Sequence, residues 1–323
     1  MIPPSRSFSL HLAPMEGVVD FVLRDLITEM GGVDRCVTEF IRVTRHLHSP
    51  AILERYAPEL KMGCRTRAGT PLFIQFLGGE ATPMAENAAQ AAELGALGID
   101  LNFGCPAKTV NRHDGGASLL KTPERVFQIT QAVRAAVPLA TPVTVKIRLG
   151  FDDPSICFEN VLAAENAGAQ ALTLHCRTKT DGYRPPAYWE WIPKIREKTK
   201  IPIVANGEIW TVEDFERCQE ITGCTSYMLG RGAVARPTLF REIKNQAAEK
   251  ISIQQSWSQI KMVLPRFFAA STDYRSGSFA QARTKQWLKA LALKHDDAKP
   301  LFEELKVLTQ PEQFRSRLEQ LLS

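Results

Sequence analysis

Residues 143–176 read VTVKIRLGFDDPSICFENVLAAENAGAQALTLHC, two apolar β-type runs on either side of a helical stretch. Similar runs, rich in Val, Ile, Leu and Thr, recur along the chain, and each is followed by a helical stretch. Eight strands that alternate with helices within about 240 residues are typical of a (β/α)8 barrel, the TIM barrel. The predicted strands are 8–14, 36–40, 71–78, 99–104, 143–149, 171–176, 202–205 and 226–230.

The alternative is a doubly wound open sheet, in which a glycine-rich phosphate-binding turn is expected after the first strand. The residues at that place are APMEG (13–17), which is not such a turn. Helices are predicted at 83–94, 123–137 and 213–222. Beyond residue 240 the strand signal stops, and helical periodicity marks 256–273, 279–294, 299–308 and 311–322. The sequence therefore predicts an α/β protein, with a TIM-barrel domain over 1–240 and a small helical bundle over 241–323.

The charge of the chain is concentrated near its C-terminus. Residues 1–240 hold 26 Lys and Arg against 26 Asp and Glu, whereas residues 241–323 hold 14 against 9, the whole excess of +5. A basic appendage on a neutral body indicates a polyanionic partner, although a solvated helical surface is an equally good interpretation from charge alone. The average apolar content of 44% excludes a disordered chain.

Three further features bear on where the protein works. The chain has seven cysteines, an odd number, and no C-x-x-C pair. No apolar run approaches the roughly 18 residues of a membrane span, and residues 1–12 lack the apolar core of a signal peptide. We expect a reduced cytoplasmic protein that has no membrane contact.

Polar side chains interrupt the predicted strands at their carboxyl ends, although strands of a parallel barrel should be almost wholly apolar. Barrel enzymes place their active sites at this rim, which favours a site over structural pairing. Alternation along a strand sends each set to one face. The sets are Gln75; Asp100 and Asn102; Thr144, Lys146 and Arg148; Thr173, His175 and Arg177; and, after the seventh strand, Asn206 and Glu208.

Two glycine turns and one cysteine extend this predicted site. Asn206-Gly207-Glu208 and Gly230-Arg231-Gly232 follow the last two strands, where backbone N–H groups often bind phosphate; ordinary turns are the alternative. Cys105 lies in a Gly/Pro turn after the fourth strand, so we expect a functional thiol there and structural roles for the other six cysteines. The loop 114–118 is a candidate to close over it. No metal-ligand spacing is present.

These residues belong to stretches that together resemble the bacterial tRNA-dihydrouridine synthases, in the order and spacing of that family. Within the family, TEFIR (38–42), GYR (182–184) and ARTKQW (282–287) look most like the C-type subgroup, which acts on position 16 of the D-loop. The family stretches are APMEG (13–17), LNFGCP (101–106), VKIRLG (145–150), HCRT (175–178), VANGEI (204–209) and MLGRGA (228–233).

The resemblance implies an FMN-dependent enzyme that reduces the C5–C6 double bond of a tRNA uridine. Hydride would pass from flavin N5 to C6 and a proton from Cys105 to C5, and NADPH would recharge the flavin. The flavin ring would contact Ala13, Pro14, Met15, Gln75, Lys146 and His175. The ribityl phosphate would lie among Asn206, Gly207, Glu208, Gly230 and Arg231.

The resemblance also implies tRNA as substrate, with the target base flipped into the pocket. Asn102 and Arg148 would hold that base, and no protein partner is implied, so we expect a monomer. Two alternatives stay open: an FMN enzyme for a small pyrimidine, of the dihydroorotate dehydrogenase kind, and a tRNA-binding protein without catalysis. The candidates for orienting the tRNA are Arg42, Tyr183, Arg184, Arg283 and Lys285.

Overall fold

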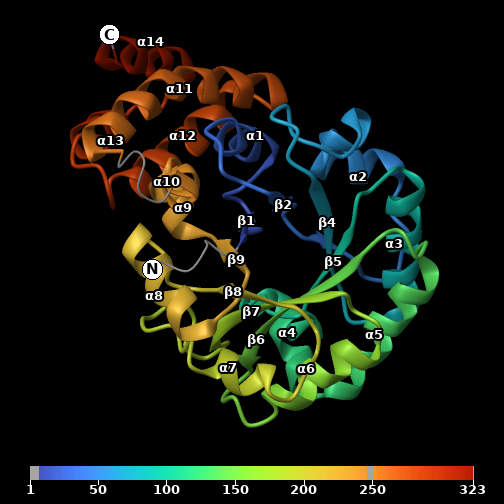
Figure 1. The fold of residues 1–323 in the computed structure, drawn as a ribbon. Helices are drawn as coiled ribbons and strands as arrows, with labels where there is room; N and C mark the ends of the chain where they lie inside the picture. The colour runs from blue at the N-terminus through green and yellow to red at the C-terminus, as the bar shows by residue number, and fades with distance from the viewer. Residues whose placement is uncertain (1–6, 246–250, 323) are drawn as a thin grey trace.

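The structure, a computed structural model, describes residues 7–245 and 251–322, and a closed barrel of parallel strands dominates it (Figure 1). The strands pair in the order β2-β1-β9-β8-β7-β6-β5-β4, and a β2–β4 pairing closes the ring. The predicted TIM barrel is confirmed, and the open sheet is wrong. The strands are β1 (Ser9–Leu12), β2 (Arg35–Val37), β4 (Leu72–Leu77), β5 (Ile99–Asn102), β6 (Val143–Gly150), β7 (Ala171–Thr178), β8 (Ile203–Asn206) and β9 (Ser226–Leu229).

The second strand is shorter than the sequence predicts. We expected 36–40, but β2 ends at Val37, and a separate two-residue strand, β3 (Ile41–Arg42), pairs with the end of β4. The Thr38 hydroxyl accepts the Gln75 backbone N–H at 2.9 Å, so a side chain takes the ladder bond at this point. The strand therefore breaks where a side-chain acceptor competes with the backbone.

Helices surround the barrel between successive strands (Figure 1). The three predicted helices are present, and each begins or ends within two residues of its predicted bounds. The helices are α1 (Phe21–Glu29), α2 (Pro50–Tyr56), α3 (Ala81–Glu93), α4 (Lys108–Arg112), α5 (Pro123–Ala136), α6 (Cys157–Asn166), α7 (Trp191–Arg196) and α8 (Val212–Thr222), with short 3-10 turns at η1 (Pro58–Met62) and η2 (Gly116–Lys121).

The C-terminal quarter is helical, as predicted, and lies beside α1 (Figure 1). Phe267 and Trp287 pack edge to face with ring centroids 4.7 Å apart inside this bundle. Among the described residues, no helix is both long and apolar enough to cross a bilayer. The helices after β9 are α9 (Arg231–Ala235), α10 (Leu239–Asn245), α11 (Ile253–Tyr274), α12 (Gly277–Leu291), α13 (Ala298–Leu305) and α14 (Pro311–Leu322). Because α10 spans residue 240, the division at 240/241 stays a prediction.

The bundle is joined to the barrel by specific polar contacts. Trp287 Nε1 donates to the Val234 carbonyl at 3.1 Å, and an exposed ion pair at 2.8 Å links Arg266 of α11 to Glu29 of α1. The guanidinium of Arg283 is buried against the loop between β1 and α1. The bundle is therefore attached next to one wall of the barrel mouth.

Candidate functional site

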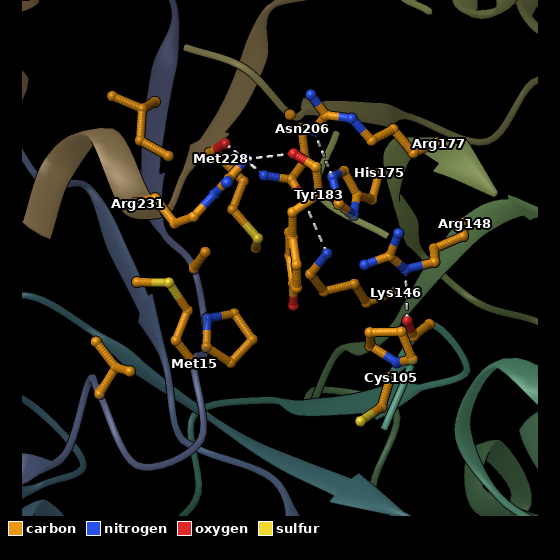
Figure 2. Close-up of a pocket in the computed structure, with 18 of the residues that line it drawn as sticks. Met15, Cys105, Lys146, Arg148, His175, Arg177, Tyr183, Asn206, Met228 and Arg231 are labelled. Carbon is orange, nitrogen blue, oxygen red and sulfur yellow. Dashed lines mark hydrogen bonds between the residues drawn. The ribbon is translucent and has the colours of Figure 1, made fainter. Parts of the chain in front are cut away.

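A deep cavity lies at the carboxyl ends of the strands, where barrel enzymes place their sites. Its volume is about 530 Å³, within the range of about 300–1,000 Å³ that ligand pockets occupy. Figure 2 shows Lys146, Arg148 and Cys105 on one side of it and Met15 on the other. Of the predicted site residues, the cavity brings together Ala13, Pro14, Met15, Asn102, Cys105, Lys146, Arg148, His175, Tyr183, Asn206, Gly207, Glu208, Gly230 and Arg231.

Five predicted residues do not line this cavity. Gln75 is fully buried beneath it, where its amide donates to Asp100 and accepts from Asn102 Nδ2 at 2.9 Å. Arg42 and Arg184 are exposed elsewhere on the rim. Lys285 is half-buried and donates to the Leu308 carbonyl.

Arg283 is 6% exposed and its guanidinium is occupied by protein acceptors. Its Nε donates to Asp20 Oδ2 at 2.9 Å and its Nη1 to the Gly17 carbonyl at 2.7 Å. The same structure therefore argues against a direct tRNA contact for Arg283, because a phosphate would have to displace buried partners.

The cavity is cationic. Lys146, half-buried on β6, donates to Asn206 Oδ1 at 2.9 Å, and the burial of its ammonium, with Arg148 nearby, lowers its pKa to about 8. Burial, with Arg231 nearby, lowers the pKa of the Arg177 guanidinium to about 10. Glu208 is the carboxylate that pairs with both Arg177 and Arg231. A wall with this excess of positive charge favours an anionic ligand.

His175 on β7 is held neutral. Burial, reinforced by Arg148 and Lys146, keeps the pKa of its imidazole well below the usual range. Its Nε2 lies 3.3 Å from Arg177 Nη1, and because a guanidinium can only donate, Nε2 accepts. The ring proton therefore belongs on Nδ1, which leaves a neutral donor in the cationic wall.

The loop after β5 holds Cys105 at the edge of the cavity. The backbone N–H groups of Gly104 and Cys105 both donate to Asn102 Oδ1 at 2.9 Å, so the Asn102 amide supports this turn rather than pointing freely into the cavity. Cys105 is half-buried, while the other six cysteines are buried. Burial raises the pKa of the Cys105 thiol, which keeps it protonated at neutral pH.

Arg148 ties the loop after β5 to the loop after β7. Its Nε donates to the Gly104 carbonyl at 2.8 Å, and its Nη1 donates to the carbonyls of Thr178 and Gly182. The Tyr183 ring, about half exposed at the mouth, lies under the guanidinium groups of both Arg148 and Arg231, 5.2 and 4.9 Å from its centroid. Two cations therefore fix an aromatic ring at the entrance.

Among the other residues that line the cavity, Arg177 is predicted on the rim without a role, and no role is predicted for Trp210 and Met228. Arg177 shares the face of His175 on β7, so strand alternation was a usable signal. Trp210 donates to Glu208 Oε1 at 2.8 Å from a loop, and Met228 is an apolar residue of β9. Neither carries a polar pattern that a sequence could reveal. In the part of the chain that the structure describes, no group of His, Cys, Asp and Glu could hold a metal.

A closed parallel barrel with a cationic cavity at its carboxyl rim defines an α/β-barrel enzyme that takes an anionic ligand. The model of the dihydrouridine synthase (Dus) family matches residues 11–321, so the chain belongs to that family. It is therefore a flavin-dependent oxidoreductase.

Curated relatives agree over almost the whole chain. A tRNA-dihydrouridine(16) synthase of Pseudomonas putida is 48% identical over 92% of this chain and 92% of its own length. The enzyme of the same name from Neisseria meningitidis serogroup A is 44% identical over 97% of this chain and 94% of its own length. The matches include the bundle as well as the barrel.

Solved structures agree in fold alone. A DHODH of Eimeria tenella has a TM-score of 0.56 at 13% identity, covering 73% of this chain and 79% of its own. A histamine dehydrogenase of Rhizobium sp. 4-9 has a TM-score of 0.56 at 14% identity, covering 77% of this chain and 46% of its own. Both comparisons agree with the barrel described above.

Proposed function

We propose that this protein reduces the C5–C6 double bond of uridine 16 in tRNA, with FMN as cofactor and NADPH as reductant. The observation that carries the proposal is that a half-buried thiol, Cys105, and a half-buried ammonium, Lys146, line the same cavity. Relatives that match the barrel and the bundle are named for position 16, which supports the choice of substrate. A small-pyrimidine enzyme would not need the basic bundle, and a non-catalytic protein would not need the thiol.

The residues present fit FMN. The cavity is large enough for a ligand of this size and its cations exceed its carboxylates, as a phosphorylated ligand requires. Asn206, Gly207, Glu208, Gly230 and Arg231 would surround the phosphate end, and Ala13, Pro14, Met15, Lys146 and His175 would line the ring. Gln75 would act from beneath, through Asn102. When bound, the flavin supplies hydride for uracil C6.

The chain's own part in the reaction is the proton. Cys105 would hold it as a thiol and deliver it to uracil C5, leaving a thiolate that solvent reprotonates. Asn102 and Arg148 position this thiol, because both hydrogen-bond the backbone of its turn. Tyr183 would stand at the entrance through which the flipped base comes.

Recognition of the tRNA would use exposed cations around the rim and on the bundle. Arg42 and Arg184, which are exposed, keep this role in the proposal, and so does Lys285, which is half-buried on the bundle. We further propose that the protein works as a monomer in the cytoplasm, with no protein partner; its seven unpaired cysteines suit a reducing compartment.

Arg283 has a different place in this proposal. Because it holds the Gly17 and Val18 carbonyls of the loop whose residues 13–16 line the cavity, Arg283→Gln should weaken FMN binding about tenfold. Titration of the apoprotein with FMN, followed by quenching of flavin fluorescence, measures this. Arg266→Gln is the matched control, since it removes an exposed bundle–barrel ion pair whose two residues do not line the cavity. Equal affinities in the two variants would contradict the assignment.

The function is tested by mapping dihydrouridine in tRNA from a strain that lacks the gene and again after the gene is restored. We expect loss and recovery at position 16 alone. A change at another D-loop position would keep the chemistry and overturn the position. No change in tRNA, with turnover of orotate or free uridine by the purified protein, would favour the small-pyrimidine alternative.

A further inference from the structure

The loop that carries Cys105 runs over residues 105–117 and returns to its own start. The Cys105 carbonyl accepts Ala117 N–H at 3.1 Å and Asn111 Nδ2 at 2.9 Å. A side chain at Gly116 would place its Cβ 2.8 Å from that carbonyl, so the close return requires glycine. The position of the thiol therefore depends on where the far end of this loop is fixed.

The far end is fixed against the segment that follows β4. The backbones touch there, since a Cβ at Gly79 would lie 2.1 Å from the Asp114 carbonyl oxygen. Arg125, in the first turn of α5, joins the two segments: its Nη1 pairs with the Asp114 carboxylate, and its Nη2 donates to the Gly79 carbonyl at 2.6 Å. One guanidinium thus holds both sides of this contact.

The inner side of the loop is apolar and packs toward the same strand. Val110 of the loop clusters with Phe40 and Leu77, and Cys105 packs against this cluster. The apolar contacts set the depth of the loop, while Arg125 supplies the polar attachment at its outer edge. These two restraints give a single defined position to a loop whose end contains the flexible pair Gly115 and Gly116.

We propose that Arg125 is a positioning residue for the proton donor, because it fastens the Cys105 loop to the end of β4. This inference rests on the proposed function for its effect on catalysis. The inference also predicts the accessibility of the Cys105 thiol, which can be measured whatever reaction the protein catalyses. Without Arg125 the loop separates from the segment that follows β4. The Cys105 thiol then becomes more accessible to solvent and is held less precisely in the cavity.

The test uses the full-length holoenzyme and iodoacetamide, with alkylated Cys105 quantified by peptide mass spectrometry. Arg125→Gln should raise the alkylation rate of Cys105 several-fold. It should also slow dihydrouridine formation in a single turnover by about tenfold to hundredfold, the size of effect expected from a misplaced reacting group. Flavin content and flavin reduction by NADPH should not change. Asp114→Asn should give a smaller effect, since the bond to Gly79 remains and Asn tolerates the positive φ of 57° at this position.

Arg134→Gln is the matched control on the same helix. Arg134 donates to the carbonyls of Val137 and Thr141 at the opposite end of α5, so its loss should leave both the alkylation rate and the turnover as in the parent. An unchanged alkylation rate in Arg125→Gln would overturn the proposal. If the parent protein makes no dihydrouridine but Arg125→Gln still speeds the alkylation of Cys105, the positioning role is upheld and the proposed function is overturned.

Discussion

Cys105→Ala is expected to lower the rate of dihydrouridine formation by about 10²–10⁴-fold, the usual contribution of a positioned general acid. The bound flavin and its reduction by NADPH should be unchanged, because the thiol supplies only the proton at C5. The thiol is suited to this role since burial raises its pKa and keeps it protonated at neutral pH. Single-turnover assays with reduced enzyme and tRNA measure the effect directly.

Cys105→Ser gives a graded control, because a hydroxyl fits the same space and is a much weaker acid. We expect its rate to fall between those of the parent and of the alanine variant. The pH profile adds a second check: the acid is active while protonated, so this group should cause no loss of rate until the pH rises above its elevated pKa. Full activity in Cys105→Ala would remove the residue from the mechanism.

The sequence predicted the barrel and most of the cavity because both depend on patterns that repeat along the chain. Alternation on β6 sends Lys146 and Arg148 to one face, and the cavity contains both. Alternation predicts the face of the strand on which a side chain lies, but it does not predict how deep in the barrel that side chain lies. It could not tell that Gln75 lies a layer beneath the cavity and acts on Asn102, because depth depends on register between β4 and β5.

Arg283 shows where charge is a poor guide. An arginine in a basic helical segment suggests a solvent-exposed phosphate ligand. Besides Gln286 on its own helix, its partners lie 263–266 residues earlier in the chain, in Asp20 and the carbonyls of Gly17 and Val18, and no local pattern connects these distant residues to it. A buried, fully bonded guanidinium is a tertiary feature, and burial costs little only because those acceptors are in place.

Lys146→Met is the second variant for which we expect a large effect, a roughly 10²–10³-fold slower reduction of the bound flavin by NADPH, comparable to the loss of one preorganised electrostatic group. The methionine keeps the apolar stem and removes the charge that would offset the anionic form of the reduced cofactor. Stopped-flow absorbance of the flavin measures the step without tRNA. Lys121→Met is the control, because Lys121 lies over Phe151 outside the cavity.

The pKa of Lys146 also predicts the direction in which the affinity for FMN changes with pH. Burial lowers that pKa to about 8 in the protein without cofactor, so the ammonium is present below about pH 8 and is lost above it. Binding of an anion depends on the charged form, and the affinity of the parent for FMN should therefore weaken as the pH rises through this value. In Lys146→Met the affinity should be lower and flat over the same range. Parallel pH dependences in the two proteins would show that another group, and not Lys146, provides the charge that the cofactor requires.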